Sequence, residues 1–362
     1  MRALLAVTGL LSLVGAGSSG SGVQVLWTSP RPITAFAQDG QLLSWFTAGE
    51  RSCNTVHVLS LGGVRAALPK ETSGTVTCRW NTAGAPPRLA VAARTGAALW
   101  TLHETATTEF DYVVGAAVTA PSERRFSQLA HATTGAGLWL GDVAGSGRTL
   151  VYSVATVAYV DQLSCLAGGS CAKRIRGGGI HRIVGRGDPL VPHTGPALEV
   201  AAAAGRVAYV PAVTVDGRGR PQPSPARALL VRTARTGTLV SRARPGGTPL
   251  ALALAPHVLA ALVESHGRKR VVWFDAEDGT RLGSIRVPAG TAPELAANDQ
   301  VVVFRVGRVV RAADVDTRKV RTLVKTSSRP IGLSLAGSRL AWAENRRGGK
   351  AEIRAIFLRG RG

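Results

Sequence analysis

The residues of this chain that could take part in chemistry are few and widely spread. Seven histidines occur among 362 residues, and the densest group of titratable side chains contains His181, Asp188 and His193. Two imidazoles and a carboxylate at this spacing could bind a metal ion or supply a general base. The Gly-Arg-Gly-Asp-Pro segment 185–189 is typical of a surface loop. We therefore favour a solvated loop over a metal or catalytic site.

Sequence motifs of known catalytic sites are absent. The sequence contains no Gly-x-Ser-x-Gly elbow, phosphate-binding loop, His-Glu-x-x-His motif or calcium loop. Asp275 and Asp278 flank a turn, as do Asp314 and Asp316, but two carboxylates supply too few oxygen ligands for Ca²⁺. We therefore predict no catalytic residue, no metal and no cofactor. Carboxylates contributed by different repeats leave no spacing signal, so an enzyme stays open as the alternative.

The four cysteines predict two disulfides in an exported chain. Cys165 and Cys171 flank a short Leu-Ala-Gly-Gly-Ser turn, and Cys53 and Cys78 fall in connections on one face of the fold inferred below. We therefore predict the local pairs Cys53–Cys78 and Cys165–Cys171. A metal site would need four converging ligands, and the Cys-x5-Cys spacing has no paired partner for one.

Residues 1–16 predict a signal peptide. Arg2 precedes an apolar run from Ala3 to Ala16, which ends in the small residues that suit cleavage. The run is shorter than the roughly 20 residues that span a bilayer, and no cysteine follows it as a lipid anchor. No other stretch of the sequence is long and apolar enough to span a membrane. We expect residues 17–362 to form one secreted or otherwise extracytoplasmic domain of bacterial type.

The charge balance is strongly basic. The chain has 44 Lys and Arg against 22 Asp and Glu, a net charge of +22. Such a charge favours anionic partners such as nucleic acid, anionic lipid or cell-wall polymers. Only six of the 44 are lysine, and no run of five basic residues occurs, which is also what codon usage in a GC-rich genome produces. We therefore disfavour specific nucleic-acid binding and leave open whether the charge is functional.

A pair of short strands recurs along the chain, and the second strand carries a large residue at a fixed place. The marker residues are Trp45, Trp100, Trp139, Tyr209, Leu262, Phe304 and Trp342. The third and weakest unit runs from Gln128 to Trp139. The intervals between markers range from 38 to 70 residues, and the shorter ones match a four-stranded propeller blade. A position repeated in every unit indicates packing between blades rather than a row of sugar-binding platforms.

This pattern resembles the β-propeller repeats of the TolB-like and WD40-like superfamily, as found in exported bacterial proteins. The resemblance covers residues 23–358 and depends on the strand pattern and the aromatic position. The Trp-Asp dipeptide and the Gly-His signature of true WD40 repeats are absent. The fold class is predicted as all-β, a closed β-propeller of seven four-stranded blades, with six or eight blades as alternatives.

The last unit lacks one strand, which suggests how the ring closes. Three strands are predicted near the carboxyl end, and the third of them is Glu352 to Leu358. An unpaired strand, Val23 to Ser29, lies ahead of the first unit. We predict that these two segments pair, because closure removes the exposed edges that promote aggregation.

Function is expected in the loops around the ring. The insertions 161–195 and 212–227 are the longest, and we expect little strand character in the second. The candidate binding residues are Trp80, His181, Asp188, His193, Arg218, Arg220 and Arg227. We interpret the chain as a non-catalytic interaction protein that binds an unknown protein or an anionic cell-envelope polymer. The alternative is an extracytoplasmic propeller enzyme, such as a hydrolase, lyase or quinone-dependent dehydrogenase.

Overall fold

The protein is built almost entirely of antiparallel strands. A computed structural model describes residues 22–48, 54–63, 65–68, 87–104, 108–132, 136–167, 171–223 and 228–358. Within these residues lie 28 strands and a single five-residue helix, α1 (Gln162–Leu166). No helix of the described part is long and apolar enough to cross a membrane. The predicted signal peptide, residues 1–16, lies outside the described residues.

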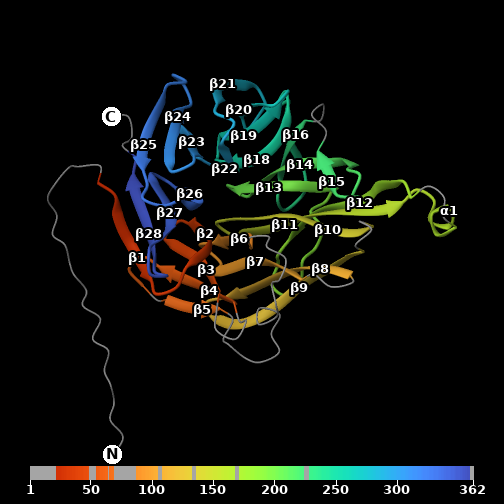
Figure 1. Ribbon diagram of the computed structural model, residues 1–362, viewed down its shortest axis with the longest axis horizontal. Coiled ribbons are helices and arrows are strands. Elements are labelled where there is room, and N and C mark those ends of the chain that lie inside the picture. The colour runs from red at the N-terminus through yellow and green to blue at the C-terminus, as the bar shows by residue number, and fades with distance from the viewer. Residues whose placement is uncertain are drawn as a thin grey trace, which may run out of the picture.

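The strands form seven blades around a central axis (Figure 1). Blade 1 contains β2 (Ile33–Asp39), β3 (Leu42–Ala48), β4 (Asn54–Ser60) and β5 (Arg65–Leu68). Blade 2 contains β6 (Leu89–Ala92), β7 (Ala97–Glu104), β8 (Thr108–Ala117) and β9 (Ala120–Ala132). Blade 3 contains β10 (Gly137–Ser146), β11 (Thr149–Tyr159) and β12 (Lys173–Arg182), and the segment after β12 turns back and bridges to it.

The other four blades follow the same plan. Blade 4 contains β13 (Ala197–Ala203), β14 (Arg206–Val215), β16 (Leu229–Thr233) and β17 (Leu239–Ala243), with β15 (Pro221–Pro223) paired to β14. Blade 5 contains β18 (Thr248–Leu254), β19 (Val258–Ser265), β20 (Arg268–Asp275) and β21 (Arg281–Val287). Blade 6 contains β22 (Thr291–Ala297), β23 (Val301–Val306), β24 (Val309–Asp314) and β25 (Val320–Lys325). Blade 7 contains β26 (Ile331–Ala336), β27 (Arg339–Asn345), β28 (Ala351–Phe357) and β1 (Gln24–Ser29). The predicted seven-bladed propeller is confirmed.

The ring closes as predicted. Strand β1 pairs antiparallel with β28, with Thr28 opposite Glu352. Blades 7 and 1 are also joined by a buried polar contact in which Gln38 Nε2 donates to the carbonyl oxygens of Ser334 (2.6 Å) and Arg339 (2.9 Å). The amino-terminal strand therefore completes the last blade as its fourth strand and covers the edge of β28.

The core lies between the blades. The described residues form seven clusters of buried apolar side chains, one at each interface of neighbouring blades. The marker residues Trp45, Trp100, Tyr209, Phe304 and Trp342 are each at most 1% exposed. The predicted role of these aromatics in packing between blades is confirmed.

The third predicted unit was wrong. Residue Trp139 lies half-buried on β10, the innermost strand of blade 3, and Gln128 belongs to β9, the last strand of blade 2. The marker position is taken by Tyr152, which is 1% exposed and lies opposite Val143. The intervals around it become 52 and 57 residues in place of 39 and 70. The error arose because the last strand of one blade and the first of the next give the same strand–turn–strand pattern as a hairpin within a blade.

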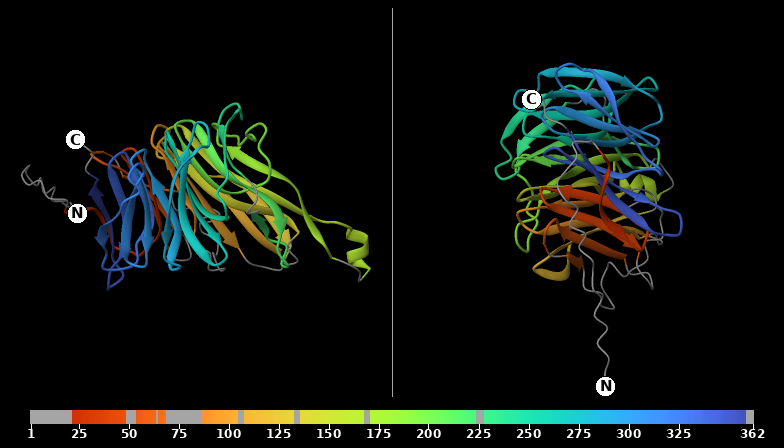
Figure 2. Two further views of the ribbon diagram at one scale, coloured as in Figure 1. Left: turned by 90° about the horizontal axis from the view of Figure 1, so that it is seen from above. Right: turned by 90° about the vertical axis from the view of Figure 1, so that its left-hand side faces the viewer.

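Two hairpins extend beyond the regular blades. In blade 4, β14 runs on to Val215 and pairs with β15, so the prediction of little strand character in residues 212–227 was wrong. The Asp216 side chain stabilises the turn between them by accepting backbone N–H bonds of Arg218 (2.9 Å) and Arg220 (2.8 Å). In blade 3, the end of β11, α1 and the first part of β12 form a long projection, here called the arm (residues 156–167 and 171–177), which reaches far from the ring (Figure 2).

Candidate functional site

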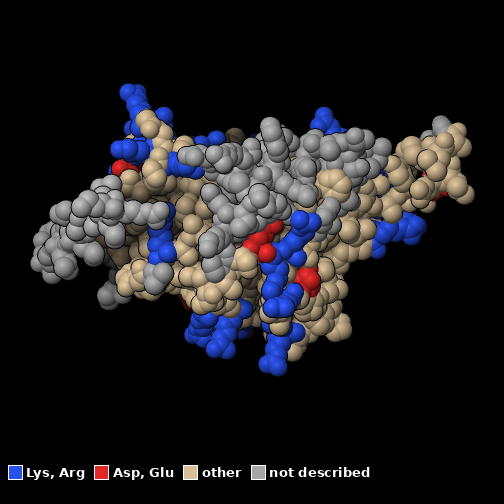
Figure 3. All heavy atoms as spheres, turned by 90° about the horizontal axis from the view of Figure 1, so that it is seen from below, with Lys and Arg blue, Asp and Glu red and all other residues tan. Residues whose placement is uncertain are grey.

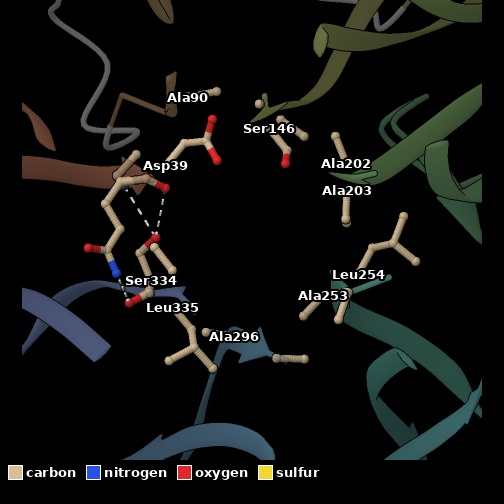
Figure 4. A pocket seen from close by; sticks show the side chains of 18 of the residues that line it. Asp39, Ala90, Ser146, Ala202, Ala203, Ala253, Leu254, Ala296, Ser334 and Leu335 are labelled. Atoms are coloured by element: carbon tan, nitrogen blue, oxygen red, sulfur yellow. Dashed lines mark hydrogen bonds between the residues drawn. The ribbon is translucent and has the colours of Figure 1, made fainter. Parts of the chain in front are cut away.

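The innermost strands enclose a cavity on the ring axis. Strands β2, β6, β10, β13, β18, β22 and β26 line a volume of about 670 Å³. Small residues such as Ala90, Ala202, Ala253 and Ala296 face it (Figure 4). Alanines suit these positions because seven strands converge there and leave little room for large side chains.

The polar groups around this cavity are engaged in joining blades. The Asp39 carboxylate accepts backbone N–H bonds from Ala93 and Gly147, both at 2.6 Å, and so links the turns of blades 2 and 3 to blade 1. The Asp299 carboxylate accepts the backbone N–H of His257 at 2.8 Å. These hydrogen bonds give the Asp39 and Asp299 carboxylates a structural role, because each bond joins neighbouring parts of the ring.

A second group of charges lies across three blades on the innermost strands. Arg88 precedes β6, Asp142 lies on β10 and Glu199 lies on β13. The Arg88 Nη1 atom is 3.0 Å from Asp142 Oδ1 and 3.8 Å from Glu199 Oε1. The backbone N–H of Asp142 also donates to Ser153 Oγ at 2.9 Å. Arg88 therefore compensates two carboxyl groups from neighbouring blades.

The environment of this cluster changes its protonation. Burial raises the pKa of Glu199 to about 8, and the nearby charge of Asp142 and a hydrogen bond to it act in the same direction, whereas Arg88 opposes them. The charge of Asp142 raises the pKa of Arg88, which stays cationic. At neutral pH the pair therefore retains a proton on Glu199, beside the Asp142 carboxylate. Such a pair can hold blades together, and it can donate or accept a proton.

Sequence reasoning missed this cluster. The three residues are 54 and 57 residues apart, about one blade each, so no local motif marks them. The signal that could have found them is a polar residue recurring at one position of successive inner strands. The wrong phase assigned to the third unit concealed that recurrence.

The structure brings together only part of the predicted histidine cluster. His181 Nδ1 donates to the carbonyl oxygen of Asp188 at 2.9 Å, and the ring of His181 stacks on that of Tyr152 with centroids 4.9 Å apart. The Tyr152 hydroxyl donates to the Asp188 carboxylate, and burial first, then this bond, raises the pKa of Tyr152. His193 is exposed and contributes to none of these contacts. No group of three potential metal ligands occurs in the part of the chain that the structure describes.

The other predicted binding residues are dispersed. Arg218 and Arg220 are exposed at the turn of the β14–β15 hairpin. Trp80, Arg227, Cys53 and Cys78 lie outside the described residues, so the roles predicted for them stay predictions.

The arm carries an exposed apolar tip. Leu163 and Leu166 on α1 are 78% and 77% exposed, the highest values for large hydrophobic side chains in the described ranges, and Val160 is 49% exposed. The predicted disulfide Cys165–Cys171 is confirmed and ties α1 to the start of the returning strand. In the space-filling view most of the tip carries no charge, a small acidic area lies at its underside, and basic side chains lie beside it on the arm (Figure 3).

Comparisons with known proteins give the fold alone. No protein-family model matches the sequence, and no curated protein matches it either. The acylaminoacyl peptidase of Pyrococcus horikoshii is 9% identical over 90% of this chain and 50% of its own, with a TM-score of 0.51. BamB from Moraxella catarrhalis is 14% identical over 91% of this chain and 84% of its own, with a TM-score of 0.43. The computationally designed Ika8 protein is 11% identical over 92% of this chain and 98% of its own, with a TM-score of 0.48. A shared fold at such identities carries no function with it.

Proposed function

We propose that this protein is an exported, non-catalytic β-propeller that binds a macromolecular partner of the cell envelope through segments projecting from its ring. The observation that carries the proposal is the arm, whose tip presents Leu163 and Leu166 at more than three-quarters exposure. Large apolar side chains gathered at a projecting tip mark an interaction site more often than a chance exposure. The leader-like residues 1–16 and the Cys165–Cys171 disulfide support export.

The ring is a rigid base, and the arm extends away from it. The buried interfaces between blades keep the base of β11 and β12 fixed, since both strands pair along most of their length. The disulfide closes the tip within a six-residue separation. A tip that is already ordered loses less conformational entropy on binding, which favours contact through this segment.

Shortening the arm tests the proposal. Because Tyr159 lies opposite Lys173, residues 160–172 can be replaced by an Asn-Gly turn without changing the register of the hairpin. As a matched control, residues 216–220 can be replaced in the same way, since Val215 lies opposite Pro221. The exported full chain and both variants are then incubated with isolated cell-envelope material, after their melting temperatures have been shown to agree.

The arm variant should lose retention on the envelope material and the control should keep it. Equal retention of the parent and the arm variant would contradict the role of the arm. Loss in the control alone would assign the contact to the β14–β15 hairpin with Arg218 and Arg220. A mature chain that still contains residues 1–16 would contradict export through a cleaved leader.

A second candidate, a propeller enzyme, is favoured by one observation. A protonated Glu199 beside the Asp142 carboxylate is the kind of pair that performs general acid–base hydrolysis. A screen of the exported protein against polysaccharides, esters and peptides tests it. Turnover that disappears in both Glu199→Gln and Asp142→Asn would support this candidate, and turnover unchanged in both would reject it.

A further inference from the structure

We infer that the tip of the arm docks on an anionic lipid bilayer. This inference rests on the proposed function and names its partner. It combines two features of the arm that lie next to each other in the fold: an apolar tip on α1 and a group of basic side chains at the start of β12.

The apolar feature is a single turn of helix. Leu163 and Leu166 are three residues apart on α1, a spacing that places both side chains on one face. Val160 adds a third exposed apolar side chain where β11 ends. None of these three residues belongs to a core cluster of the described part of the molecule. They are therefore available to a partner that takes up short aliphatic side chains.

The basic side chains lie at the start of β12, the strand that follows α1 in the chain. Lys173, Arg174 and Arg176 occur within four residues of β12, and Arg174 and Arg176 are exposed. These three are the basic residues of the arm, which holds one acidic residue, Asp161. No ion pair between described residues involves Lys173, Arg174 or Arg176. Lys173 Nζ lies 5.8 Å from the centroid of the Tyr159 ring, which keeps this cation beside the strand.

The spacing of the two features fits the layers of a membrane surface. With a rise of about 3.3 Å per residue, Arg174 lies about 10 Å along the strand from Cys171. Amphipathic segments enter a bilayer by about 5–10 Å, so a buried tip would place Arg174 at the headgroups. Arg176, two residues further, would lie within about 8 Å of that level, the screening length at physiological salt.

Neither feature alone would indicate a membrane. A protein groove would accept the two leucines but would not require cations just behind them. An anionic polymer would bind the cations but would leave Leu163 and Leu166 in water. A surface with an apolar interior and anionic headgroups engages both, which is why we favour anionic lipid.

Vesicle co-sedimentation of the full chain tests the inference. Vesicles of phosphatidylcholine are compared with vesicles in which half of the lipid is phosphatidylglycerol. One variant combines Leu163→Ser with Leu166→Ser, and a second combines Arg174→Glu with Arg176→Glu. Controls of matched chemistry are Leu239→Ser with Val320→Ser, which are exposed apolar residues of other blades, and Arg281→Glu with Arg286→Glu, which are exposed basic residues of β21. Melting temperatures are measured for every variant, so that only folded proteins are compared.

The parent should bind the anionic vesicles at least about tenfold more tightly than the neutral ones, because each basic residue near such a surface adds attraction. Each arm variant should lose about tenfold in affinity, whereas both controls should stay within about twofold of the parent. Binding to neutral and anionic vesicles alike, or binding that survives Leu163→Ser with Leu166→Ser, would overturn the inference.

The outcomes also separate this inference from the proposed function. If the parent ignores both kinds of vesicle but the 160–172 replacement still abolishes retention on a delipidated envelope protein fraction, the partner is a protein and only the lipid inference fails. If neither vesicles nor envelope material distinguishes the parent from that variant, both fail together.

Discussion

Replacing Glu199 by glutamine should flatten the pH dependence of folding stability above about pH 5. In the folded chain, burial raises the pKa of Glu199 to about 8 from its ordinary value of 4.5. The unfolded chain therefore ionises Glu199 first as the pH rises. Because the folded state then holds the extra proton, its free energy of unfolding falls as the pH rises from about 4.5 to about 8.

The size of the effect follows from the difference between the two pKa values. At about 1.4 kcal/mol per pH unit, the full difference corresponds to about 5 kcal/mol. Glu199 keeps 27% of its side-chain area exposed, so screening by solvent reduces this figure. We expect a fall of about 2–3 kcal/mol in the parent that is absent from the variant. The glutamine amide can still donate to Asp142, so the variant should fold.

Denaturant unfolding of both proteins at several values between about pH 5 and about pH 9 measures the difference. Glu277→Gln is the control, because Glu277 is 46% exposed in a surface pair with Arg206 and should not alter the slope. Parallel stability curves for the parent and Glu199→Gln would refute the assignment of a shared proton to this cluster. A slope that changes equally in Glu277→Gln would attribute the effect to surface charge.

Three further outcomes follow from the structure. Deletion of residues 17–29 removes β1 and its pairing with β28. The deletion should therefore lower the free energy of unfolding by at least about 3 kcal/mol. An unchanged melting temperature would contradict closure of the ring by this strand. Burial first, and then the charge of Arg65, lowers the pKa of His57 to about 4. The parent should therefore lose stability as the pH falls from 6.5 toward 4, and His57→Gln should remove that loss. If urea unfolding gives the same slope of stability against pH for both proteins in this range, His57 is not responsible. Replacing Cys165 and Cys171 by serine should speed proteolysis of the arm, because closing this short loop contributes about 2 kcal/mol to the stability of the arm. The melting temperature of the ring should stay the same. A matching fall in that melting temperature would mean that the arm does not unfold on its own.

Local patterns predicted the recurring strand pair of the last four blades, since the markers Tyr209, Leu262, Phe304 and Trp342 all lie on the second strand of a blade. The turn predicted at Asp275 and Asp278 is present, and it joins β20 to β21 in blade 5. Closure by the amino-terminal strand was also predictable, because an incomplete last unit and a spare first strand leave one arrangement without free edges. The phase of blade 3 was not predictable in this way, since β9, β10 and β11 alternate alike and only pairing distinguishes Trp139 from Tyr152.

The sequence by itself determined what depends on neighbours along the chain. A period of two in apolar residues specifies a strand and its buried face, and the six-residue separation of Cys165 and Cys171 brought their disulfide within reach. Tertiary structure decided what depends on distance across the ring. Arg88, Asp142 and Glu199 meet only because three inner strands converge on one axis, and the pKa of Glu199 rises because that convergence buries most of its side chain and brings Asp142 beside it. The exposure of Leu163 and Leu166 was equally a tertiary outcome, since a short apolar helix is buried or exposed according to whether its hairpin folds back on the ring or projects from it.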